Sequence, residues 1–141
     1  MISLIVRIDL GEHGKLGPGK LMLLQKIDEL GSISAAGRSM KMSYRQAWGL
    51  INQLNSAFKE PVVRSQAGGE MGGGAKLTEF GKLLLLHCNA MVTNTRRAAQ
   101  PHLDFLEAVL AADGREELGT RDAEEHRQRP QPPHSKTEVS N

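Results

Sequence analysis

Apolar residues recur at helical spacing between Gly31 and Phe58, within two short segments that are separated by a tight turn. In the second segment they fall on one face, as in a helix packed against a core. The apolar positions are Ala47, Trp48, Ile51, Leu54 and Phe58, and the opposite face carries Arg45, Gln46, Gly49, Asn52, Gln53 and Ser56. A bracing helix followed by a helix that is apolar behind and polar in front is typical of a helix-turn-helix.

Serine residues stand where both helices of this pair are expected to begin. Ser34 is predicted to cap a first helix over residues 35–40, because a serine oxygen can accept a backbone N–H that the helix leaves unpaired. Lys41 and Met42 form the turn, and Ser43 is predicted to cap the second helix.

The chain before this pair predicts a strand and a supporting helix. Residues 2–10 alternate apolar and polar side chains, which indicates a strand with one apolar face. A loop is expected over residues 11–19, with Pro18 placed to start a helix. That helix is predicted to bury a set of aliphatic side chains and to end at Gly31. The set is Leu21, Leu24, Ile27 and Leu30, or one rotated slightly from it.

A glycine-rich hairpin is expected after the pair. Pro61 ends the second helix, and residues 62–64 read as a short strand. Residues 67–74 (AGGEMGGG) predict a hairpin tip, because glycine adopts backbone angles that other residues avoid. Residues 75–77 would form the return strand. Two strands in this position make a wing beside the helix-turn-helix.

The longest helix is predicted to begin at a Thr78 cap and to continue to about residue 110. Its apolar stripe is close to heptad spacing, and Pro101 is expected to kink or split the helix near Gln100. The stripe comprises Phe80, Leu83, Leu84, His87, Met91, Thr95, Ala98, His102, Phe105 or Leu106, and Val109. So small a domain cannot cover such a stripe, which predicts a homodimer through helix 79–110. The alternative is that the second half of the helix folds back on its own domain.

Composition changes after residue 112. The first 112 residues hold 13 Lys and Arg against 9 Asp and Glu, whereas residues 113–141 hold 5 against 7. The second part is rich in charged residues, Gln, Pro and Ser and poor in aliphatic residues, so we expect it to be a disordered tail. The domain prediction is therefore a single folded domain over residues 1–112 and a tail over 113–141.

Several classes of protein are disfavoured by what the sequence lacks. It has no run of 18 apolar residues and no cleavable leader pattern, so we expect no membrane span and a cytoplasmic location. The single cysteine, Cys88, allows no internal disulfide, and the five histidines show no metal-binding spacing. No serine–histidine–acid set or paired carboxylate is evident, so neither an enzyme nor a bound cofactor or metal is predicted.

The segment GSISAAGRSMKMSYRQAW resembles the N-terminal DNA-binding domain of the ModE family of molybdate-responsive regulators. It is similar, more loosely, to the winged helix-turn-helix of LysR-type regulators. Downstream, PVVRSQAGGEMGGGAKLTEFGKLLL matches the wing and the start of the long helix. The resemblance covers residues 2–110. It does not extend to the molybdate-binding domains of ModE proteins, so molybdate binding is not expected of this chain.

The resemblance also implies which residues contact DNA. The start of the recognition helix, Ser43, Tyr44, Arg45 and Gln46, would reach base edges, with Arg45 bound to guanine or, almost equally, to a phosphate. Gly49 would permit close approach and Asn52 would reach a base or a phosphate. Ser32 and Ser34 are placed for phosphate, and Arg64 and Lys76 flank the wing. No acidic residue lies between Glu29 and Glu60, which favours contact with an anionic partner.

The predicted fold class is α+β: mainly helical with a small β wing, an N-terminal strand and a long C-terminal dimerisation helix. The predicted function is a sequence-specific, double-stranded DNA-binding transcriptional regulator of ModE N-terminal type that lacks a molybdate domain. One alternative is a protein-interaction module that docks on a regulator or polymerase. A weaker alternative is an oxyanion-responsive protein with a pocket between protomers.

Overall fold

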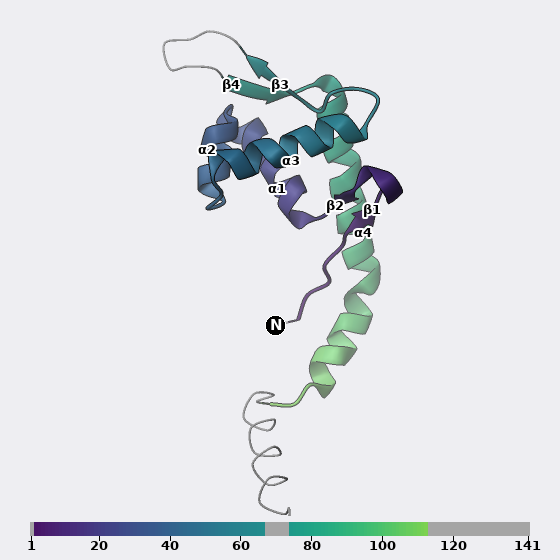
Figure 1. Ribbon diagram of the computed structural model, residues 1–141. Helices are drawn as coiled ribbons and strands as arrows, with labels where there is room; N and C mark the ends of the chain where they lie inside the picture. Colours follow the sequence, from purple (N-terminus) through teal and green to yellow (C-terminus); the bar gives the residue numbers. More distant parts are fainter. Residues whose placement is uncertain (1, 67–73, 113–141) are drawn as a thin grey trace, which may run out of the picture. The chain divides into compact units, whose positions relative to one another are not determined.

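The computed structural model describes residues 2–66 and 74–112. Helices dominate this part of the chain, and two pairs of short antiparallel strands complete it (Figure 1). The α+β fold class predicted from the sequence is thereby confirmed. In the described ranges no helix is both long enough and apolar enough to cross a membrane.

The helix-turn-helix consists of α2 (Ile33–Ser39) and α3 (Tyr44–Ala57), which pack on each other. Ser43 caps α3 as predicted, since its Oγ accepts the backbone N–H of Gln46 at 3.1 Å. The prediction for α2 was wrong by two residues: Ser32, not Ser34, is the cap, and its Oγ accepts the Ala35 N–H at 3.1 Å. The register differs because Ile33 is buried and is already helical.

The N-terminal segment keeps its predicted alternation but forms little sheet. Even-numbered residues from Ile2 to Leu10 are half-buried and odd-numbered ones are exposed. Only β1 (Ile8–Asp9) is hydrogen-bonded as a strand, antiparallel to β2 (Lys15–Leu16). The partner strand is this short because α1 begins at Pro18, and a 3₁₀ turn, η1 (Gly11–His13), replaces part of the expected loop.

Helix α1 (Pro18–Leu30) begins with proline and ends at Gly31, which adopts the left-handed conformation, as predicted. The buried face is the slightly rotated alternative: Leu21, Leu24 and Ile27 are buried as predicted, Leu23 is fully buried, and Leu30 is 48% exposed. Helix α1 packs against α2 and against strand β4, so it supports both the helix-turn-helix and the wing.

The wing strands are β3 (Val63–Gln66) and β4 (Gly74–Leu77), paired in antiparallel register from Val63–Leu77 to Gln66–Gly74. The predicted hairpin tip falls largely on residues 67–73, which lie outside the described residues. The Ala75 N–H donates to the Gly31 carbonyl at 2.9 Å, so wing strand β4 is joined to the end of α1.

Helix α4 (Glu79–Val109) is capped by Thr78, whose Oγ1 accepts the Gly81 N–H at 2.9 Å. It continues through Pro101, so the predicted split is wrong, and the alternative of a kink stays a prediction. Of the predicted apolar stripe, Phe80 and Leu84 pack partly buried against the core, but the fully buried positions are Gly81, Leu85 and Cys88. Leu85 and Cys88 belong to the hydrophobic core. Leu83 and Leu86, by contrast, are 53% and 64% exposed.

The chain divides into two compact units between Leu103 and Asp104, within α4. The core of the first unit is formed by α1–α4, β2 and the wing strands, together with Val62. The predicted boundary after residue 112 stays a prediction, and the predicted tail, residues 113–141, lies outside the described residues.

Candidate nucleic-acid interface

The polar face of α3 is presented to solvent as the sequence predicted. Arg45, Gln46, Gly49 and Asn52 are all exposed, while Ala47, Ile51 and Leu54 on the opposite face are buried. A Cβ placed on Gly49 would meet no atom within 4 Å, so nothing inside the protein requires glycine there. The helix therefore offers a guanidinium, two amides and a bare stretch of backbone in one row, which suits a major groove.

Tyr44 and Trp48 form a pair at the start of this helix. The Trp48 indole N–H donates to the Tyr44 hydroxyl, and the two rings meet edge to face with their centroids 6.2 Å apart. Tyr44 is 56% exposed, and Trp48, predicted to be core, is half-buried at the core margin. Since Trp48 occupies an acceptor site of the hydroxyl, the Tyr44 O–H is left to donate outward.

Two of the serines predicted to contact DNA, Ser32 and Ser43, also have local roles in the protein. Ser32 is half-buried and Ser43 exposed, and each accepts a backbone N–H as a helix cap. Their own hydroxyl protons remain available as donors. Ser34 is half-buried in the first turn of α2. Ser32 directly follows Gly31, whose carbonyl accepts the Ala75 N–H, so the start of α2 lies beside wing strand β4.

The two predicted wing cations are brought together. Arg64 and Lys76 face each other in the strand register, and both are exposed. Like charges directly opposite one another on two strands repel and destabilise the pair. An anion beside the two charges would offset this repulsion.

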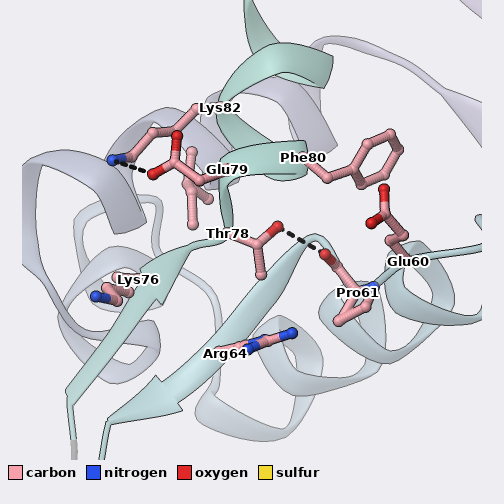
Figure 2. A pocket seen from close by; sticks show the side chains of 9 residues that line it. Glu60, Pro61, Arg64, Lys76, Thr78, Glu79, Phe80 and Lys82 are labelled. Carbon is pink, nitrogen blue, oxygen red and sulfur yellow. Dashed lines mark hydrogen bonds and ion pairs between the residues drawn. The ribbon is translucent and has the colours of Figure 1, made fainter.

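A pocket of about 320 Å³ opens at the base of the wing (Figure 2). Its lining includes Arg64, Lys76 and a cation that the sequence did not single out, Lys82, in the first turns of α4. Lys82 pairs with Glu79 at 3.4 Å, and Glu60 lies on the opposite side of the pocket. The position of Lys82 near the Thr78 cap is the only signal that the sequence gave for it.

Asn55 is a second residue that sequence reasoning missed. Its Oδ1 accepts the N–H groups of Val62 and Val63 at 2.8 and 3.1 Å, and its Nδ2 donates to the Val63 carbonyl at 3.2 Å. The side chain thus ties the last turns of α3 to the start of the wing. A half-buried asparagine in a polar stretch carries no sequence signal for such a role.

Side chains of the kinds that bind metal ions do not form a cluster in the described ranges. Residues 2–66 and 74–112 contain no group of three or more His, Cys, Asp and Glu side chains that could hold a metal ion. Cys88 is buried in the core, and burial raises the pKa of its thiol by desolvation. His87 beside it is exposed.

Comparison with known proteins defines the class to which this geometry belongs. No family model matches the chain. A crystal structure of a LysR family transcriptional regulator superposes with a TM-score of 0.52 and 19% sequence identity, over 72% of this chain and 32% of that one. At this identity the likeness concerns the fold alone. The chain is a winged helix-turn-helix protein.

Sequence comparison gives a narrower group. The chain is 35% identical over 106 residues to a transcriptional regulator ModE of Yersinia pestis, covering 73% of this chain and 40% of the relative. It is 38% identical over 68 residues to a DNA-binding transcriptional dual regulator ModE of Escherichia coli, covering 48% and 26%. The molybdenum-pterin-binding protein MopB of Rhodobacter capsulatus is 41% identical over 71 residues, covering 50% and 26%.

The chain is thus homologous to ModE transcriptional regulators, and the resemblance seen in the sequence motif is confirmed. It spans no more than about 40% of the length of these relatives. The homology therefore concerns a part of each relative.

Proposed function

We propose that this chain is a sequence-specific, double-stranded DNA-binding transcriptional regulator. The observation that carries the proposal is the exposed polar face of α3, with Arg45, Gln46, Gly49 and Asn52 in one row and no acidic residue from 30 to 59. In a helix-turn-helix this face enters the major groove, where Arg is suited to bidentate contact with guanine. The ModE names of its relatives agree with this role.

The wing supplies the second set of contacts in this proposal. Arg64 and Lys76 would neutralise phosphates beside the groove that α3 occupies, and the anionic backbone would relieve their mutual repulsion. Ser32 and Ser34 would add hydroxyl donors to phosphate oxygens, while Ser43 and Tyr44 would reach base edges with Arg45. The exposed row of α3 (Arg45, Gln46, Gly49 and Asn52) would thus recognise the base sequence, and the wing would raise the affinity for any duplex.

Dimerisation through α4 completes the proposal. Several large apolar side chains are exposed along α4. One exposed apolar residue is ordinary, but a series of them on one helix favours a surface that binds a partner. Up to residue 103 they are Leu83, Leu86 and Met91, and from residue 104 onward Phe105, Leu106 and Val109, with Leu110 directly after the helix. A two-fold dimer would place two recognition helices on a palindromic operator.

The deciding experiment is selection from a pool of random duplex DNA, followed by titration at several salt concentrations. Enrichment of a palindromic site supports the proposal. Weak binding that salt abolishes, with no enriched sequence, would overturn it in favour of a protein-docking role.

Matched variants then separate reading from anchoring. Arg45→Lys keeps the charge but loses the bidentate fork, so it should lower discrimination at one base pair by about 1–3 kcal/mol and leave the salt dependence unchanged. Lys76→Gln should weaken binding to all duplexes alike and lower the salt slope by about one. Equal losses from both variants on every sequence would contradict this division of roles.

A further inference from the structure

The Asn55 side chain uses both ends of its amide on one short stretch of backbone. Its oxygen accepts two N–H groups, from Val62 at 2.8 Å and Val63 at 3.1 Å, and its nitrogen donates to the Val63 carbonyl at 3.2 Å. Val62 and Val63 are buried, at 0% and 4% exposure. Buried backbone groups require partners, and here a side chain of α3 provides them.

These hydrogen bonds bypass the connection between the recognition helix and the wing. Helix α3 ends at Ala57 and β3 begins at Val63, and the intervening residues 58–62 form no helix or strand. Without Asn55, strand β4 would still be tied to α1 by the Ala75–Gly31 hydrogen bond, but the direct link from α3 to the wing would depend on this irregular segment. Arg64, one of the two wing cations, directly follows the Val63 that Asn55 holds.

The same stretch is fixed from its other side by the start of α4. The Val62 carbonyl accepts the Thr78 N–H at 3.0 Å and the Thr78 hydroxyl at 3.3 Å. Residues 62–63, the base of the wing, are therefore hydrogen-bonded to α3 on one side and to Thr78, the cap of α4, on the other. Among the hydrogen bonds of the described residues, those of Asn55 are the only side-chain ones that join this base to α3.

We propose that Asn55 is a positioning residue: it fixes the wing relative to the recognition helix, so that the Arg45 row and the Arg64–Lys76 pair can contact one DNA duplex together. This rests on the proposed DNA-binding function. The competing explanation is that Asn55 only satisfies two buried N–H groups. The two explanations differ in whether loss of Asn55 uncouples the wing from the recognition helix.

The first test needs no DNA. Amide hydrogen exchange is measured in the wild type and in Asn55→Ala, with Asn52→Ala as the matched control in the same helix. We expect residues 64–66 and 74–77, whose amides Asn55 does not contact, to exchange at least about tenfold faster in Asn55→Ala alone, while amides in α1 keep their wild-type rates. Unchanged wing amides, or equal acceleration of the wing and α1, would overturn the proposal.

A more conservative variant covers the case in which Asn55→Ala does not fold. Asn55→Asp keeps an acceptor for both N–H groups, but it replaces the donor to the Val63 carbonyl by a carboxylate oxygen. It should accelerate exchange in the wing by less than Asn55→Ala does and leave α1 unaffected. A wing that exchanges at the wild-type rate in this variant would count against the proposal.

The second test measures coupling on DNA. Lys76→Gln is introduced into the wild type and into the folded Asn55 variant, and binding to the selected duplex is titrated between 50 and 200 mM salt. In the wild type the variant should lower the salt slope by about 0.9, the value for one phosphate contact. In the Asn55 background the drop should be less than about a third of that, because a displaced wing no longer reaches its phosphate.

The outcomes of the second test separate the two proposals. An equal drop in slope in both backgrounds would show that the wing is placed without Asn55, and would overturn the positioning role. If the wild type binds no DNA with salt dependence, the regulator proposal fails, and hydrogen exchange alone then decides whether Asn55 fixes the wing.

Discussion

Gly81 in α4 lies against the Val62 carbonyl so closely that a Cβ on Gly81 would stand 2.1 Å from that oxygen. The oxygen is part of a backbone stretch held by Asn55 and Thr78, so it cannot move aside freely. Gly81→Ala should therefore destabilise the protein by about 1–3 kcal/mol through overpacking. Urea denaturation at constant pH measures the change, and wild-type stability in Gly81→Ala would contradict the contact.

Gly49→Ala is the matched opposite case, since a Cβ there meets nothing within 4 Å. Replacing an exposed glycine inside a helix should raise stability by about 0.5–1 kcal/mol. Gly49 lies in the row of α3 that we propose to enter the groove, so the same variant should weaken binding to the selected duplex. Thermal unfolding and a DNA titration of one preparation test both parts. A variant that gains stability without losing affinity would remove Gly49 from the interface.

The turn between α2 and α3 contains the one non-glycine residue with a left-handed backbone among those described, Lys41, at φ 57°. A residue with a Cβ loses about 1 kcal/mol of folding free energy in this conformation. Glycine avoids this strain, although its greater freedom in the unfolded chain offsets part of the gain. Lys41→Gly should stabilise the protein by up to about 1 kcal/mol. Lys41→Ala, which removes the charge but keeps the Cβ, should not. Thermal unfolding of the two variants separates relief of backbone strain from loss of charge.

Removing one charge of the Arg64–Lys76 pair should raise the stability of the free protein and lower its affinity for DNA. Lys76→Gln removes the cross-strand repulsion and should stabilise the free protein by about 0.2–1 kcal/mol, while DNA affinity falls. The stabilisation should shrink as salt is raised, because both side chains are exposed and therefore screened. Unfolding measured at low and high salt provides the check, with Ser65→Ala as a neighbouring strand control.

The sequence was most informative where one periodicity dominates. The apolar face of α3, the Ser43 cap, the Pro18 start and the Gly31 end of α1 were all legible, because each depends on residues close together in the chain. The ModE-like motif then placed the exposed row of α3 and the wing cations on a known type of fold.

What the sequence left open depends on contacts between distant segments. The buried face of α4 is set by the close approach of Gly81 to Val62 and by Cys88 in the core, and neither is marked by a large apolar residue on the heptad stripe. The N-terminal segment alternates as a strand would, but its hydrogen-bonded partner is only two residues long. Asn55 acts on residues seven and eight positions away, through an irregular connection that no periodicity describes.

Cys88 makes stability depend on alkaline pH with a definite sign. Its ordinary pKa is 9.0, and burial raises the pKa in the folded protein. Below pH 9 both states keep the proton, so the thiol adds no pH dependence. As the pH rises past 9, the unfolded chain ionises first, and the free energy of unfolding should fall by at most about 1.4 kcal/mol per pH unit. Cys88→Ala should remove this part of the slope, although it lowers stability at every pH through the cavity it leaves. Urea denaturation of both proteins from pH 7 to 10 measures the difference in slope, and identical slopes would show that the native thiol ionises as freely as the unfolded one.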